Sequence, residues 1–238
     1  MHVAILYNRV SLNDSAGDLD VLKQVVAVEQ SLTRLGHTQA RISCHLRIDE
    51  VKFALEKERP DVVFNLVESL GGTDQLMPLA TILLESMQLP FTGASTLAML
   101  KTTQKLEAKR HLLMFGLPTP AWMTNEHTGW QGLRNPDAIP TTAIIKAVAE
   151  HSSLGMNDDS VVNLADLGNS KSRSNSLANL IARKADELAT PHFAEDYIDG
   201  REFNLSVLAT GFGPNVLPPA EIEFEGFPAD KPKIVGHN

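Results

Sequence analysis

The first hundred residues alternate short apolar runs with segments of helical periodicity, and this alternation restricts the fold more than any other feature of the chain. The runs Val3–Tyr7, Gln39–Cys44 and Asp61–Val67 have the length and composition of strands. Between them, apolar residues at helical spacing predict helices over 21–35 and 48–58. Strands that alternate with helices form a parallel sheet. The sequence therefore predicts an open α/β unit with ligand-binding loops at the carboxyl ends of its strands.

The region after residue 98 predicts a second, helix-rich unit. Thr102 and Thr103 are of a type that caps helices, and they precede a helical pattern that ends before the segment Gly116–Pro120. Further elements are expected in the order strand, strand, helix and hairpin. They are Ala143–Lys146, Ser160–Val162, 177–188, and a hairpin of His192–Ile198 with the returning strand Glu202–Ala209 around an Asp-Gly turn.

Composition excludes several classes of protein. The 238 residues are 43% apolar, enough for two packed units, and 29 acidic against 21 basic residues give a net charge of −8. We therefore expect neither nucleic acid nor an anionic membrane as a partner. No apolar run approaches the ~20 residues of a membrane helix. The single cysteine, Cys44, and an amino terminus without the pattern of a secretory signal indicate a cytoplasmic protein.

Seven short motifs follow one another along the chain, and their order is more specific than any one of them. They are small-residue, acidic and lysine-containing segments. The motifs are Val63–Glu68 with Gly71–Asp74, Pro90–Gly93, Lys105, Gly116–Pro120, Lys146, Ser152–Gly155 and Glu195–Phe203. In this arrangement the chain resembles the ATP-grasp ligases of the D-alanine–D-alanine ligase type, and the resemblance covers nearly the whole chain.

The resemblance implies an α/β fold in which an open parallel-sheet N-terminal (pre-ATP-grasp) domain is followed by an incomplete α+β ATP-grasp domain. The expected domains are residues 1–98 for the N-terminal domain and 99–205 for the nucleotide-binding subdomain. Residues 206–238 are expected to begin a C-terminal ATP-grasp subdomain that is truncated.

The resemblance also implies a carboxylate–amine ligase. In that family ATP phosphorylates the carboxylate of a first amino acid, and the amine of a second attacks the acyl-phosphate to form a dipeptide-like amide. The implied partners are ATP, Mg²⁺ and small amino acids, and the family is compatible with a homodimer. Peptidoglycan biosynthesis is the process that such ligases serve, although the sequence leaves open which amino acids are joined and where the product goes.

Six residues match the ATP-binding positions of the family. Lys105 and Lys146 match lysines that meet the phosphates, whose clustered oxygens need positive charge where water is excluded. Lys146 ends an apolar strand, whereas Lys105 taken alone would be a solvated helix lysine. Glu195, Asp196 and Ile198 match the hinge at the purine, with Asp196 acting through its backbone. Glu202 matches the acceptor of the ribose hydroxyls, and a surface hairpin with acidic residues is the competing interpretation.

Ser152 and Ser153 match the family's small-residue loop over the phosphates, where hydroxyls and backbone N–H groups are donors. We assign them a catalytic role by resemblance. Two residues depart from the family pattern, because Ala147 stands where proline is usual and His151 stands where glycine is usual. An ordinary polar loop is the competing interpretation.

Glu68 and Asp74 follow the third predicted strand, and the resemblance places this loop at the amino-acid subsite. For Asp74, and equally for Thr73, helix capping is an alternative of similar weight. The loop Tyr7–Ser11 after the first strand lacks the glycine-rich, glutamate-containing stretch of authentic D-alanine–D-alanine ligases. The resemblance therefore does not assign D-alanine as the substrate.

No metal ligand is predicted in this chain. The magnesium ligands of the family follow the strand at 221–224 and are expected beyond Asn238, and the eight histidines show no spacing typical of zinc. Glu221, Glu223 and Glu225 alternate along one predicted strand face and are not offered as ligands. An alternative function is therefore a truncated, inactive nucleotide-binding or scaffold protein that lacks the metal site.

Overall fold

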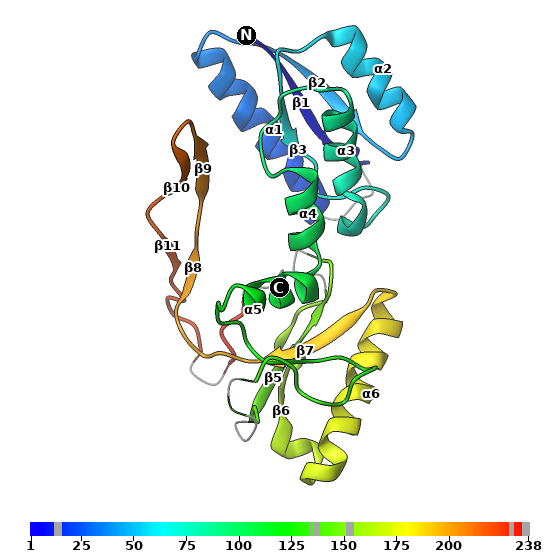
Figure 1. The fold of residues 1–238 in the computed structure, drawn as a ribbon, viewed down its shortest axis with the longest axis vertical. Coiled ribbons are helices and arrows are strands. Elements are labelled where there is room, and N and C mark those ends of the chain that lie inside the picture. Colours follow the sequence, from blue (N-terminus) through cyan, green and yellow to red (C-terminus); the bar gives the residue numbers. More distant parts are fainter. Residues whose placement is uncertain (12–15, 134, 136–138, 151–154, 229–230, 235–238) are drawn as a thin grey trace. The chain divides into compact units, whose positions relative to one another are not determined.

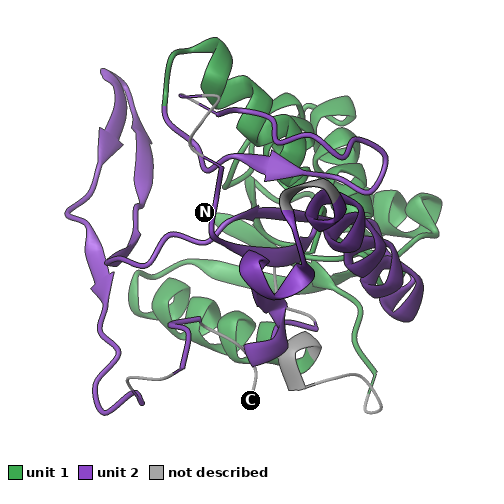
Figure 2. Cartoon of the chain, turned by 90° about the horizontal axis from the view of Figure 1, so that it is seen from below, with its two compact units in different colours: residues 1–117, 148–152 green, residues 118–147, 153–238 purple. Residues whose placement is uncertain are grey.

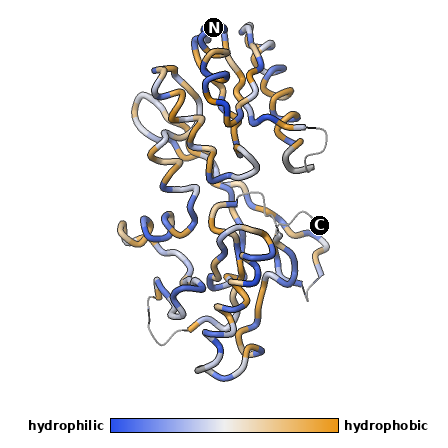
Figure 3. Tube along the Cα trace, turned by 90° about the vertical axis from the view of Figure 1, so that its right-hand side faces the viewer, coloured by the Kyte–Doolittle hydropathy of each residue, from blue (hydrophilic) through white to orange (hydrophobic). Residues whose placement is uncertain are grey.

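The computed structural model describes residues 1–11, 16–133, 135, 139–150, 155–228 and 231–234 (Figure 1). The chain forms two compact units (Figure 2). Unit 1 comprises Met1–Leu117 with Val148–Ser152, and unit 2 comprises Pro118–Ala147 with Ser153–Asn238. Figure 3 shows apolar and polar residues alternating along the helices, the pattern of helices that bury one face.

Unit 1 is built on a three-stranded parallel sheet with the order β2-β1-β3. The strands are β1 (His2–Asn8), β2 (Thr38–Cys44) and β3 (Val62–Leu66). In this register Leu6 of β1 lies opposite both Ile42 of β2 and Asn65 of β3. The predicted parallel α/β sheet is confirmed, and the three strands end together at one edge.

Helices cover the sheet of unit 1. The core beneath α2 (Ile48–Glu58) and α3 (Pro78–Ser86) joins Leu6 to Leu55 and Leu84, and α1 (Ala16–Arg34) also packs on all three strands. The 3₁₀ turn η1 (Asp74–Leu76) leads into α3. The apolar run Val3–Leu6 of the central strand is buried by cover of this kind, since a parallel sheet buries both faces.

The helices at the end of unit 1 begin where the sequence did not indicate. The structure has α4 (Thr96–Thr103), capped by the Ser95 hydroxyl, which accepts from the Ala98 N–H at 3.4 Å, and then α5 (Lys105–Met114). The predicted cap at Thr102 and Thr103 is wrong, because these residues form the last turn of α4 and the Thr102 hydroxyl donates to the Ala98 carbonyl at 2.8 Å.

Unit 2 contains a four-stranded antiparallel sheet in the order β4-β7-β5-β6. Its strands are β4 (Trp122–Met123), β5 (Thr142–Ala147), β6 (Val161–Asn163) and β7 (His192–Asp196). One face packs against α6 (Ser170–Leu188), where Ile145 and Ala194 meet Leu177 and Ile181 in one core cluster. The 3₁₀ turns η2 (Asp158–Ser160) and η3 (Leu164–Leu167) flank β6.

The strand after the Asp-Gly turn does not return along β7 as predicted. Instead β8 (Glu202–Asn204) pairs with β11 (Ala220–Ile222), and β9 (Val207–Thr210) pairs with β10 (Gly213–Val216). Both edges of β7 are already taken by β4 and β5, so no edge is left for a returning strand. We call β8 to β11 the ribbon; Figure 1 shows it as an extended orange and brown segment.

The boundary between the two compact units follows Leu117 in the sequence. The boundaries of the expected functional domains lie instead after residues 98 and 205. The helix α4 belongs to compact unit 1 because it packs against α3 and α5. The division into nucleotide-binding and C-terminal subdomains describes functional parts, and we retain it as a proposal. In the described part of the chain, no helix is both long and apolar enough to cross a membrane.

Candidate functional site

Lys146 and Glu195 lie on the face of the unit 2 sheet that α6 does not cover. In the antiparallel register of β5 and β7, Ile144 lies opposite Glu195 and Lys146 lies opposite Phe193. Side chains alternate between faces along a strand, so these residues share one face while Ile145 and Ala194 point into the core beneath α6. The sequence places a cation and an anion side by side on this otherwise apolar face.

The two side chains form an ion pair. Lys146 Nζ donates to Glu195 Oε1 at 2.7 Å, and the side chains are 29% and 12% exposed. Removing either partner leaves a charge with little water around it, which is a large penalty. An ammonium group has three donors, so Lys146 can hold Glu195 and still contact an anionic ligand.

Asp196 closes β7 and uses its backbone within the sheet. Its N–H donates to the Ala121 carbonyl at 2.9 Å, and the Tyr197 N–H donates to the Thr142 carbonyl at 3.1 Å. Partial burial, and secondly the neighbouring Glu195 charge, raise the pKa of the Asp196 carboxyl. Ile198 and Glu202 follow with exposed side chains.

Lys105 begins α5 in unit 1 and contacts the segment that follows β5. Its backbone N–H donates to the Val148 carbonyl at 2.9 Å, and its Nζ donates to the Glu150 carbonyl. Both contacts tie α5 to the residues just before the predicted phosphate loop. Lys105 is therefore part of a defined arrangement and not a freely solvated helix lysine.

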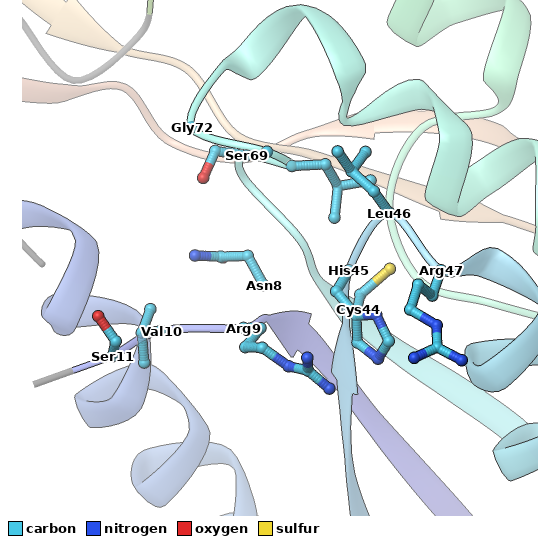
Figure 4. Close-up of a pocket in the computed structure, with 12 residues that line it drawn as sticks. Asn8, Arg9, Val10, Ser11, Cys44, His45, Leu46, Arg47, Ser69 and Gly72 are labelled. Atoms are coloured by element: carbon cyan, nitrogen blue, oxygen red, sulfur yellow. The ribbon is translucent and has the colours of Figure 1, made fainter.

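A pocket of about 550 Å³ lies in unit 1, where β1, β2 and β3 end (Figure 4). Its lining comes from three loops: Asn8, Arg9, Val10 and Ser11; Cys44, His45, Leu46 and Arg47; and Ser69, Leu70, Gly71 and Gly72. Ligands of open α/β sheets bind at this edge. Gly71 has a φ of +62°, and a Cβ there would lie 2.7 Å from Leu46 Cδ1, so this wall is in close contact with the β2 loop.

Curated D-alanine–D-alanine ligases align with most of the chain. The ligase of Pseudomonas entomophila is 28% identical over 227 residues, which cover 91% of this chain and 59% of that protein. The ligase of Moorella thermoacetica is 35% identical over 140 residues, which cover 56% of this chain and 43% of that protein. The chain is therefore similar to D-alanine–D-alanine ligases over most of its length.

The fold of this ligase-like chain agrees with that family. A crystal structure of the D-alanine–D-alanine ligase of Bacillus anthracis complexed with ATP matches with a TM-score of 0.57 at 17% identity, covering 91% of this chain and 70% of that one. No protein-family model matches the chain. The alignments span 43% and 59% of the two curated relatives, which is less than two thirds of either.

Of the residues predicted to bind ATP, the structure pairs Lys146 with Glu195 and places Asp196 next to them. Lys105 lies in the other compact unit. Ser152 and Ser153, with His151, lie outside the described residues, whereas Ala147, the other departure from the family pattern, is buried at the end of β5. The assigned roles of these residues stay predictions.

At the predicted amino-acid subsite of the ligase-like chain, Glu68 and Asp74 do not line the pocket. Glu68 accepts a hydrogen bond from Gln24 Nε2 at 3.1 Å, and Asp74 is buried as the first residue of η1. Thr73 is the cap of that turn, since its hydroxyl accepts from the Gln75 N–H at 3.2 Å. Of the two capping candidates, the structure selects Thr73.

Sequence reasoning missed the β2 loop, His45 to Arg47, as a contributor to the pocket. The usable signal was topological: β2 is parallel to β1 and β3, so its loop must reach the same edge.

Among the described residues no three His, Cys, Asp or Glu side chains gather as they would around a metal ion. The described residues thus do not fit the Mg²⁺ that the family implies.

Proposed function

We propose that this chain supplies the nucleotide-binding part and the first-substrate part of a carboxylate–amine ligase that acts through an acyl-phosphate. The observation that carries the proposal is the Lys146–Glu195 pair on the open face of the unit 2 sheet. Its support is the similarity of the chain to D-alanine–D-alanine ligases and the likeness of its fold to a ligase structure that was determined with ATP. The family relatives are named for joining D-alanine to D-alanine.

In this proposal Lys146 neutralises charge on the ATP phosphates. The ion pair with Glu195 fixes the ammonium group before the nucleotide arrives, so little conformational entropy is lost on binding. The carboxylate of Glu195, the backbone around Asp196 and the side chain of Ile198 face the purine. Glu202 accepts hydrogen bonds from the ribose hydroxyls.

The acyl-phosphate needs positive charge and protection from water. We assign the charge to Lys105 and Lys146, and the cover to the loop that contains Ser152 and Ser153. The described residues offer no cluster that fits Mg²⁺, and we derive no step through a metal ion. The carboxylates of Glu68 and Asp74 stay in the proposal as residues near the amino-acid subsite.

The first test is the stabilisation of the chain by ATP. A ligand that binds only the folded state raises the melting temperature, so ATP should raise the melting temperature of the wild-type chain. Lys146→Ala should abolish that rise, and Lys146→Arg should retain part of it. Because Lys146→Ala also breaks an ion pair, each variant is compared with its own nucleotide-free melting temperature. Lys52→Ala, on the exposed side of α2, is the control and should leave the rise unchanged.

Turnover separates the ligase from its alternative. ADP release that requires ATP, Mg²⁺ and an amino acid supports the ligase. Stabilisation by ATP without such turnover supports the alternative, a nucleotide-binding or scaffold protein. An equal ATP-induced rise in wild type and Lys146→Ala would remove Lys146 from the site and contradict the proposal.

A further inference from the structure

The pocket at the ends of β1, β2 and β3 gathers hydrogen-bond donors and cations. Asn8, Arg9, His45 and Arg47 contribute side chains, and none of the twelve lining residues is acidic. In Figure 4 the Arg9, His45 and Arg47 side chains are drawn across the opening from Ser69 and Gly72. The whole chain has a net charge of −8, so this local excess of positive groups is a specific property of the pocket.

Asn8 offers a donor that no group in the described part of the chain uses. The residue is only 5% exposed, and its Oδ1 accepts from the Glu68 N–H at 3.5 Å. That contact orients the amide, and Figure 4 shows its nitrogen directed into the open space between Ser69 and Val10. Among the residues that the structure describes, this nitrogen has no acceptor. The amide nitrogen is not one of the buried atoms that lack a partner, so it is accessible from the open pocket and can donate to a ligand or to water.

Arg9 is held at the pocket by its backbone, while its guanidinium is available. The Arg9 N–H donates to the Cys44 carbonyl at 2.8 Å, which joins the first and second loops. Within the described part of the chain, the Arg9 guanidinium forms no ion pair. A guanidinium presents a planar fork of donors that matches the two oxygens of a carboxylate.

The remaining charges on the β2 loop do not cancel the excess. Glu50 is the acidic group that faces it, at 2.5 Å from an Arg47 nitrogen and 3.6 Å from His45 Nε2. One carboxylate thus serves both residues. The helix α2 starts at Ile48, directly after Arg47, and Asp49 and Glu50 in its first turn offset the positive end of the helix, so the excess at the pocket comes from the side chains of Arg9 and the β2 loop.

We propose that this pocket binds a carboxylate on the side chain of the first substrate, which makes an acidic amino acid the preferred substrate class. The proposal rests on the ligase function proposed above and deepens it. A volume of about 550 Å³ accommodates an amino acid of the size of glutamate. The Asn8 amide and the Arg9 fork bind the side-chain carboxylate and leave the α-carboxylate for phosphorylation.

The test compares ligands of equal size that differ by one charge. Calorimetric titration of the 238-residue chain with D-glutamate and D-glutamine, and with the L-enantiomers, measures the preference directly. We expect one glutamate enantiomer to bind about tenfold more tightly than its amide, with a preference that weakens as salt is added. Equal binding of glutamate and glutamine would overturn the proposal.

Two variants and one control locate the effect. Asn8→Asp keeps the oxygen that accepts from the Glu68 N–H but replaces the open donor by a carboxylate, so it should abolish the preference for glutamate. Arg9→Gln should reduce glutamate affinity about tenfold and leave glutamine affinity unchanged. Arg183→Gln, on the exposed surface of α6, should change neither affinity. Unchanged glutamate binding in both pocket variants would contradict the assignment.

Inorganic phosphate separates a substrate site from a general anion site. Phosphate that displaces glutamate with the same affinity would show a general anion site and overturn the substrate assignment. Failure of the proposed function has a different signature, since it removes the ATP-induced stabilisation that depends on Lys146 and leaves glutamate binding untouched. Glutamate selectivity with no ATP effect would therefore reject the ligase, and an ATP effect without glutamate selectivity would reject only the pocket assignment.

Discussion

At the scale of single residues, the environment of each charged group decides what it can do. Lys146 and Glu195 are both predicted ATP-binding residues, but only the register of β5 and β7 shows that they contact each other. The sequence could place a lysine at the end of a strand. It could not give the partner, because 49 residues separate the two.

Cys44 gives a prediction at this scale that concerns pH. Burial raises the pKa of its thiol from 9.0 to about 11, so the folded state holds the proton more tightly than the unfolded chain. The stability that this group contributes is present below pH 9 and is lost as the pH rises toward 11. The free energy of unfolding of wild type relative to Cys44→Ala should therefore fall by roughly 2 to 3 kcal/mol over that interval.

Urea unfolding of both proteins at pH 8 and near pH 11 measures this difference. The Cys44→Ala protein corrects for tyrosines and lysines that titrate in the same range. A thiol that is alkylated rapidly by iodoacetamide in the native state at pH 8 would show instead that Cys44 is accessible and has an ordinary pKa.

At the scale of elements, hydrophobic periodicity predicted the elements better than their ends or their partners. The strands β1 and β3 were evident because each contains a short, nearly continuous apolar run, whereas β2 alternates polar and apolar residues and is buried mainly at Ile42 and Cys44. The prediction that the strand after the Asp-Gly turn returns along β7 was wrong. A turn signal says that the chain reverses, but the edges free to accept a strand depend on the whole sheet.

The start of the helix α4 was also not evident from the sequence, and its observed cap gives a prediction. Ser95 caps α4, whereas the Thr102 hydroxyl bonds back to Ala98 inside the helix. Ser95→Ala should lower the free energy of unfolding by about 1 kcal/mol, and Thr102→Ala should have a much smaller effect. Urea unfolding measures both, and a larger loss in Thr102→Ala would instead favour the cap that the sequence predicted.

At the scale of the whole molecule, the ribbon is one of the segments that expose several large apolar side chains. Its large apolar side chains, each more than 40% exposed, are Phe203, Leu205, Val207, Leu208, Phe212 and Val216. Several exposed apolar side chains on one segment favour association. The candidate site could be predicted only in part at this scale. The sequence predicted where the strands of unit 1 end, but the pocket there is formed by three loops that are distant from one another in the sequence.

We therefore expect the isolated chain to self-associate with increasing concentration. Sedimentation velocity should show a shift to larger species, and Leu208→Ser with Phe212→Ser should reduce it. Phe53→Ser is the matched control, since Phe53 is 67% exposed but lies on α2, away from the ribbon in the sequence. A chain that sediments as a monomer at every concentration would contradict this expectation.

The contact between Gly71 and Leu46 determines how the pocket can change. Leu46 Cδ1 lies only 2.7 Å from the position that a Cβ at residue 71 would take. A larger residue at 71 must therefore move the Leu46 side chain and is strained by the positive φ, while a smaller residue at 46 would make room without disturbing the backbone of the β3 loop. Substitutions can therefore widen the pocket at Leu46 more easily than they can narrow it at Gly71, so larger ligands are easier to accommodate than smaller ones are to select.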